Sequence, residues 1–234
     1  MLVRSGSARN ETIDLRLAGV LSGVAGALNA SAFYAAGFFS ANMTGNVSLL
    51  SDGLALGRFG EAGFFLLLVT VFIAGSFTAT RIISGGLRRG NTRIYAVTIL
   101  IEAFLLALLG GTVLLAPLPW NTRLMVMGLA FILGLQNAVG TRISDARLRT
   151  THVSGIVTDI GIELGLLTRE DGKDQRAVTI AKLRLHLCTL LSFLGGGVIG
   201  LVFYRGVGAG VLFCAAFFLL ILATPAFRRD RYVK

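Results

Sequence analysis

The pattern of hydrophobic and polar residues along the chain predicts several membrane-spanning helices. Six stretches are almost wholly apolar for about 20 residues, the length that a helix needs to cross roughly 30 Å of hydrocarbon. They cover residues 17–36, 62–83, 94–116, 124–139, 185–204 and 207–226, and the fourth is short. Polar or basic segments separate them. We therefore expect an all-α integral membrane protein with about six transmembrane helices.

Composition supports this interpretation and excludes several classes of protein. The 234 residues are 54% hydrophobic and 15% charged, against about 25% charged residues in a soluble domain. A net charge of +10 would suit a nucleic-acid partner, but the basic residues lie in short loops between apolar stretches. We expect membrane lipid as the surroundings and no nucleic acid. The absence of nucleotide and metal motifs predicts no cofactor and no metal.

The distribution of basic residues predicts the orientation of the chain. With a cytoplasmic N-terminus, only Arg58, Arg123 and Arg205 of the 22 lysines and arginines lie outside. Such an asymmetry is typical of loops that stay in the cytoplasm. The chain is therefore predicted to be a multi-pass protein of the inner (plasma) membrane with both termini in the cytoplasm.

Two segments, residues 37–57 and 150–167, are half apolar and half polar. If the first crossed the membrane, the basic loop over residues 81–93 would lie outside, against the charge rule. One interpretation is a re-entrant or broken-helix segment, which requires surrounding protein or a watery cavity. The other is an amphipathic helix at the membrane surface.

The two interrupted segments belong to an internal repeat. Gly26-Ala27-Leu28-Asn29-Ala30 matches Gly134-Leu135-Gln136-Asn137-Ala138, and Met43-Thr44-Gly45 matches Val153-Ser154-Gly155. Three spans in each half, residues 1–116 and 117–234, make the second half enter from the opposite side. The sequence thus predicts two inverted three-helix repeats, a plan of secondary transporters whose interrupted helices meet near the midplane.

These motifs, with Asn42-Met43-Thr44-Gly45-Asn46 and Thr151-His152-Val153-Ser154-Gly155, resemble the YoaK-like family of bacterial membrane proteins of unknown function. The resemblance covers nearly the whole chain and implies a six-helix inner-membrane protein, with no known substrate. Similar proteins often carry Asp at the position of Asn29 and Thr at that of Ser154. The first difference removes a potential charge, and the second keeps a hydroxyl.

Polar residues in and beside the apolar stretches are the candidate binding residues, since each needs a partner or water. The alternatives are ordinary roles: hydrogen bonds between helices, a capped turn, or a histidine in a surface loop. The candidates for binding a solute are Asn29, Asn42, Thr44, Gly45, Asn46, Asn137, His152, Ser154 and Gly155. Half-helices starting after Thr44 and Ser154 would favour an anion.

Two carboxylates are candidates for coupling to a proton or another ion. Glu102 lies well inside an apolar stretch, where a carboxylate is costly and indicates a function by default. Asp159 shares a helix face with Glu163. The alternative for Glu102 is a buried pair with an arginine or a hydroxyl, and the alternative for Asp159 is a cytoplasmic face that balances nearby arginines.

We expect a transporter of a small polar solute or anion, not an enzyme. An intramembrane hydrolase, with Ser154 as nucleophile and His186 as base, is the second hypothesis, and a structural or channel-like membrane protein is the third. Glycines 19, 23, 196 and 200 form small faces for close helix packing, within one chain or in a homodimer.

Overall fold

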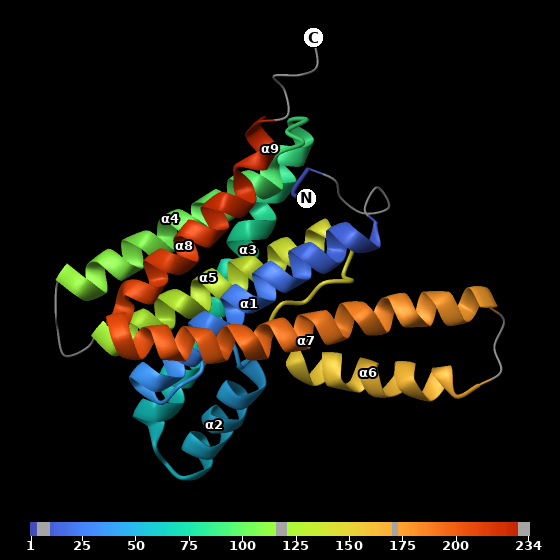
Figure 1. The fold of residues 1–234 in the computed structure, drawn as a ribbon. Helices are drawn as coiled ribbons and strands as arrows, with labels where there is room; N and C mark the ends of the chain where they lie inside the picture. The colour runs from blue at the N-terminus through green and yellow to red at the C-terminus, as the bar shows by residue number, and fades with distance from the viewer. Residues whose placement is uncertain (4–9, 116–120, 170–172, 229–234) are drawn as a thin grey trace.

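The computed structural model describes residues 1–3, 10–115, 121–169 and 173–228, and these contain helices and no strand (Figure 1). The all-α class is therefore confirmed. The elements are α1 (Glu11–Ala36), α2 (Met43–Ala55), α3 (Phe59–Arg88), α4 (Ile94–Leu115), α5 (Asn121–Ile143), α6 (Val153–Leu167), α7 (Lys173–Val207), the 3₁₀ turn η2 (Gly208–Gly210), α8 (Val211–Ala223) and α9 (Pro225–Arg228).

Five helical segments of the described chain are long and apolar enough to cross a membrane. Four are α1, α3, α4 and most of α5, and the fifth covers Asp174–Phe227, which contains α7, η2 and α8. Their outer faces are apolar: the side chains of Phe77, Phe104 and Val202 are more than 60% exposed. Exposed apolar surface of this extent is stable in lipid and not in water. The chain is thus a multi-pass membrane protein, and the number six stays a prediction.

The long helices pack in pairs that join distant parts of the chain (Figure 1). The most extensive contacts are those of α1 with α7, α3 with α5, and α4 with α8. Helices α1 and α5 also touch each other and are the most enclosed of the long helices. The core of the bundle therefore lies around α1 and α5, and the other long helices expose more of their surface.

Glycines bring two of these pairs into backbone contact. A Cβ atom added at Gly26 of α1 would lie 2.0 Å from the Phe193 carbonyl oxygen of α7, and one at Gly196 of α7 would lie 2.0 Å from the Gly23 carbonyl oxygen. Only residues without a side chain allow helices to approach this closely. The small faces seen in the sequence are thus used within one chain, between α1 and α7.

The pair of α3 and α5 is built in the same way. A Cβ at Gly75 of α3 would lie 2.0 Å from the Phe131 carbonyl oxygen, and one at Gly134 of α5 would lie 2.2 Å from the Phe72 carbonyl oxygen. The Ser76 hydroxyl donates a hydrogen bond of 2.9 Å to the Gly134 carbonyl oxygen at this crossing. Close backbone contact therefore fixes both helix pairs.

Each interrupted segment folds as a loop followed by a short helix. Helix α2 follows the loop over residues 37–42 and packs on α3, while α6 follows the connection over residues 144–152 and packs on α7 (Figure 1). Gly37 ends α1 in the left-handed region at φ 75°, and its N–H donates to the Phe33 carbonyl oxygen. Glycine adopts this conformation without strain.

Helices α5 and α7 are among those that are longer than the apolar stretches that predict them. Helix α5 continues to Ile143, beyond the expected end at residue 139, and Arg142 there donates to the Ser84 hydroxyl. Helix α7 begins at Lys173, twelve residues before the expected Leu185. This first part of α7 is amphipathic and is covered by α6. Tertiary contacts, not hydropathy alone, therefore set these boundaries.

Candidate functional site

The predicted asparagines of the first half hold the loop between α1 and α2. Asn29 Oδ1 accepts a hydrogen bond of 2.9 Å from the Ala41 N–H, and Asn46 Nδ2 donates to the Phe39 carbonyl oxygen at 3.3 Å. Asn42 caps α2, since its Oδ1 accepts from the Gly45 N–H at 3.0 Å. Thr44 is exposed in the first turn of α2. The polar groups of this cluster are thus largely occupied by backbone.

Asn137 makes the corresponding hydrogen bonds to the loop that follows α5 in the second half. Its Oδ1 accepts hydrogen bonds from the Thr150 N–H at 3.1 Å and from the Thr150 hydroxyl at 2.9 Å. Its Nδ2 donates to the Thr151 hydroxyl. Asn29 and Asn137 therefore each bind the loop that follows their own helix, and within the described residues no hydrogen bond joins the two.

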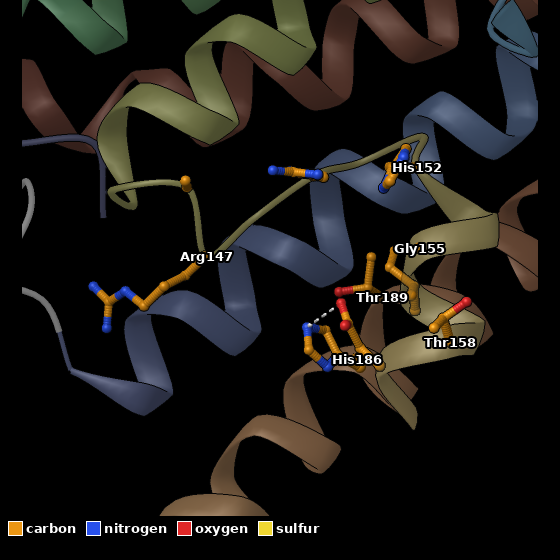
Figure 2. Close-up of a pocket in the computed structure, with 10 residues that line it drawn as sticks. Arg147, His152, Gly155, Thr158, His186 and Thr189 are labelled. Atoms are coloured by element: carbon orange, nitrogen blue, oxygen red, sulfur yellow. Dashed lines mark ion pairs between the residues drawn. The ribbon is translucent and has the colours of Figure 1, made fainter. Parts of the chain in front are cut away.

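A cavity of about 400 Å³ lies where the connection from α5 meets α6 and α7 (Figure 2). Three residues predicted from the sequence line it, namely His152, Gly155 and Asp159. The predicted Ser154 is exposed and does not line it. The other lining residues are Ala146, Arg147, Arg149, Ile156, Thr158, His186 and Thr189. The connection from α5 and helix α6 thus provide most of the wall, and α7 provides the rest.

One side of the cavity is a histidine between two carboxylates. His186 Nδ1 lies 2.9 and 3.1 Å from the two carboxylate oxygens of Glu163, and His186 Nε2 lies 3.9 Å from Asp159 Oδ2. The Glu163 side chain is only 6% exposed, whereas that of Asp159 is 52% exposed. Both carboxylates stand on α6, four residues apart, so they face α7 together. His186 makes no hydrogen bond with Ser154.

The opposite side is basic. Arg147 forms an ion pair of 3.2 Å with Asp14 of α1, and Figure 2 shows its side chain extending away from His186. Arg149 and His152 are exposed and have no ion pair or hydrogen bond from their side chains in the described part of the chain. These two residues are therefore available to a ligand.

The start of α6 adds further donors. His152 stands at the N-cap position, and its side chain forms no capping hydrogen bond. The first N–H groups of α6 lack helical partners, as they do in any helix, and the positive end of the helix dipole favours an anion there. A Cβ at Gly155 would lie 2.3 Å from His152 Nδ1, so glycine allows the imidazole to lie against the first turn.

The turn before the cavity is strained. Asp145 and Ala146 have φ of 56° and 64°, the left-handed region that residues other than glycine rarely adopt. Ser144 holds the turn, because its hydroxyl accepts from the Leu148 N–H at 2.8 Å and donates to the Gly140 carbonyl oxygen at 2.7 Å. Together with the ion pair of Arg147, these contacts fix the wall of the cavity.

Glu102 lies elsewhere, at the contact of α4 with α5. It is fully buried, and its Oε1 accepts a hydrogen bond of 2.9 Å from Gln136 Nε2, which is also fully buried. Neither residue lines the cavity. The predicted coupling residues Glu102 and Asp159 therefore lie in two separate polar clusters.

Sequence reasoning did not assign roles to Arg149 or Gln136. It named Glu163 as the partner of Asp159 on one helix face, and it considered His186 as a base for Ser154. The signal for Glu163 was its spacing of four from Asp159. His186 stands among apolar residues at the start of the predicted fifth stretch, where a histidine is uncommon. Arg149 was hidden among basic residues that also satisfy the charge rule of membrane topology.

Comparison with known proteins yields a family and no function. Residues 17–224 match a family described as Protein of unknown function (DUF1275). No curated protein and no solved structure matches the chain. YoaK-like proteins are members of this family, so the resemblance drawn from the Gly-x-x-Asn-Ala and Asn-Met-Thr-Gly-Asn motifs is confirmed. Since the match covers nearly the whole chain, this membrane protein belongs to the DUF1275 family.

Proposed function

We propose that this protein transports a small polar solute, most simply an anion, across a bacterial inner membrane. The observation that carries the proposal is the cavity of about 400 Å³ at the start of α6. In this cavity Arg149 and His152, whose side chains have no partner among the described residues, lie beside the first N–H groups of α6. Polar groups that converge on a cavity are the usual sign of a small-molecule site.

An inverted repeat supports a transporter. The glycine crossings of α1 with α7 and of α3 with α5 correspond position by position: Gly26 and Gly134 are 108 residues apart, as are Gly23 and Phe131. On the partner helices, Phe72 and Phe193 are 121 residues apart, as are Gly75 and Gly196. Such exchange of helix roles between halves is expected for inverted repeats, in which one half moves against the other.

The two short helices support a re-entrant arrangement. Asn29 and Asn137, at matching positions, each accept a backbone N–H of the loop that leads into a short helix, α2 or α6. The end of α2 lies beside the start of α3, since a Cβ at Gly53 would contact Ala62. Helix α2 would thus return to the side from which its loop entered, and we propose the same path for α6. We further propose that α7 and α8 cross separately, giving six spans and two cytoplasmic termini.

The contacts of His186 favour transport over hydrolysis. A serine nucleophile requires a base within hydrogen-bond reach. His186 instead contacts Glu163 and Asp159, and Ser154 is exposed. The carboxylates beside His186 suit a positive group of a solute, and the basic side of the cavity suits a negative group. The cavity is therefore suited to a zwitterion or to an anion.

Solute-induced currents of reconstituted vesicles on a solid-supported membrane would test the proposal. The solutes are small carboxylates, amino acids and inorganic anions, and the variants are Arg149→Gln and His152→Ala. Arg58→Gln is the matched control, because Arg58 is exposed on the other half and its side chain pairs, among the described residues, with Glu61 alone at 3.9 Å.

We expect a saturable current for at least one solute, a higher half-saturation concentration in both cavity variants, and no change in Arg58→Gln. Currents that never saturate would indicate a channel. Absence of any solute-dependent signal, or cavity variants that equal the wild type, would exclude transport through this cavity.

A further inference from the structure

Glu102 and Gln136 form a polar pair within the apolar bundle that the cavity does not use. Glu102 stands on α4 between Ile101 and Ala103, and Gln136 stands on α5. Both are 0% exposed. One hydrogen bond joins them, from Gln136 Nε2 to Glu102 Oε1 at 2.9 Å.

Each member of the pair also has one oxygen without a hydrogen-bond partner. Within the described residues, neither Glu102 Oε2 nor Gln136 Oε1 accepts any hydrogen bond. Buried polar atoms in folded proteins are nearly always paired, so two such atoms on adjacent side chains require an explanation. An ionised carboxylate only accepts hydrogen bonds, and an amide oxygen does the same, so these two oxygens cannot pair as they stand.

A single proton on Glu102 gives both of these oxygens a hydrogen-bond partner. A protonated carboxyl is a donor as well as an acceptor. With its hydrogen on Oε2, Glu102 donates to Gln136 Oε1 while Oε1 still accepts from Gln136 Nε2. Carboxylic acid and amide then satisfy each other through two antiparallel hydrogen bonds, and no charge remains in the apolar interior.

No cation of the neighbouring helices replaces the proton. Glu102 forms no ion pair in the described part of the chain. The helices that pack on α4 carry few charged or titratable groups, namely Glu61, Arg81 and Arg88 on α3, Arg123 and Arg142 on α5, and the exposed Cys214 on α8. Of these, Arg142 lies nearest in sequence to Gln136, about 9 Å farther along the helix, where it bonds Ser84.

We propose that Glu102 and Gln136 constitute a proton-binding site inside the bundle, occupied by one proton and closed to water. The ligand is the proton itself, and Gln136 is the residue that orients it. This site stands apart from the solute cavity and does not depend on transport. It assigns Glu102 a neutral carboxyl, with Gln136 as both donor and acceptor.

Infrared difference spectroscopy of the purified full-length protein at neutral pH tests this site. The first comparison is the wild type with Glu102→Gln, a variant whose amide can make the same two hydrogen bonds and so keeps the fold. The matched control is Asp159→Asn, which removes a half-exposed carboxylate. We expect the wild type minus Glu102→Gln to contain the C=O stretching band of a protonated carboxyl, and the Asp159 difference to contain carboxylate bands.

A second variant makes the test independent of the folding of the first. Gln136→Leu removes the donor to Oε1, so the carboxyl band of the wild type moves to higher frequency if the pair is as proposed. A Glu102 difference spectrum with carboxylate bands alone would overturn the proposal. So would a protonated-carboxyl band that Gln136→Leu leaves unshifted, because Gln136 would then not bond the proton-bearing group.

Discussion

Adjacent glycines on α7 allow the close helix crossing to be tested with one control that differs by a single position. A Cβ at Gly196 would lie 2.0 Å from the Gly23 carbonyl oxygen, whereas one at Gly195 meets nothing within 4 Å. Both glycines are in the middle of the same helix. The variants Gly196→Ala and Gly195→Ala therefore share the helix but not the contact.

The magnitude follows from the missing space. An ordinary contact needs at least 3.4 Å, so α1 and α7 must separate by about 1.4 Å to admit the methyl group of Gly196→Ala. Overpacking of this kind costs about 1–3 kcal/mol. Replacing glycine by alanine inside a helix also stabilises it by about 0.5–1 kcal/mol. Because that gain is common to both variants, their difference isolates the cost of the contact.

Cys188 provides a reporter at the same interface. It stands on α7, half-buried, and its sulfur would lie 3.7 Å from a Cβ at Gly19 of α1. With Cys214 replaced by serine, a thiol-reactive fluorogenic dye follows thermal separation of α1 from α7 in detergent. At this chain length each kcal/mol moves the midpoint by about 2–4 °C.

We expect the thermal midpoint of Gly195→Ala to equal or slightly exceed that of the wild type. The midpoint of Gly196→Ala should be lower than that of Gly195→Ala, by the amount that a loss of about 1–3 kcal/mol in stability produces. Equal midpoints of the two variants, within about 0.5 kcal/mol, would refute backbone contact at this crossing. On α3, Gly75→Ala and the open Gly63→Ala form the corresponding test of the contact with α5.

Three other substitutions have defined effects on thermal unfolding. Asn137→Ala leaves both the N–H and the hydroxyl of Thr150 without their acceptor, whereas Asn29→Ala leaves only the Ala41 N–H without one. Because each unpaired buried group costs about 1–3 kcal/mol, Asn137→Ala should lower the stability more than Asn29→Ala. The reverse order would contradict these roles. Ala146→Gly should stabilise by about 1 kcal/mol, since glycine adopts the φ of 64° without strain, and a lower midpoint would show that the methyl group makes a needed contact.

Most of the helices could be predicted from hydropathy, and so could both ends of α4, but several other ends could not. Apolar length located α1, α3 and α4, because lipid and the core both require apolar side chains there. It placed the start of α7 at Leu185, since residues 173–184 are partly polar, whereas in the structure they continue the helix on which α6 packs. It also ended α5 early, because polar residues such as Arg142 lower hydropathy without interrupting a helix.

The candidate site could be predicted only in part. The interrupted segments directed attention to His152, Gly155 and Asp159, which line the cavity. The pairing of His186 with Glu163, 23 residues away, depends on how α6 packs on α7, which no local pattern encodes. Gln136 similarly gains its significance only from Glu102, 34 residues distant on another helix.

The two helix N-termini at the interrupted segments have nearly the same backbone and different chemistry. The N-cap residue Asn42 has φ −87° and ψ 75°, and His152 has φ −88° and ψ 58°. Asn42 accepts the Gly45 N–H, whereas the His152 side chain caps nothing. Within the described residues, the first N–H groups of α6 therefore have no capping side chain, whereas the Gly45 N–H of α2 does, and this difference supports a proposed solute site in the second half.

This difference leads to a prediction for one variant, in which stability increases while the apparent affinity for the solute decreases. In His152→Asn, the new side chain should cap α6 as Asn42 caps α2, because the backbone already has the required conformation. An N-cap of this kind stabilises by about 0.5–2 kcal/mol, so the thermal midpoint should rise. The same side chain competes with the solute for the N–H groups, so the half-saturation concentration of the solute-induced current should also rise. A more stable variant with unchanged half-saturation would show that the solute does not use the start of α6.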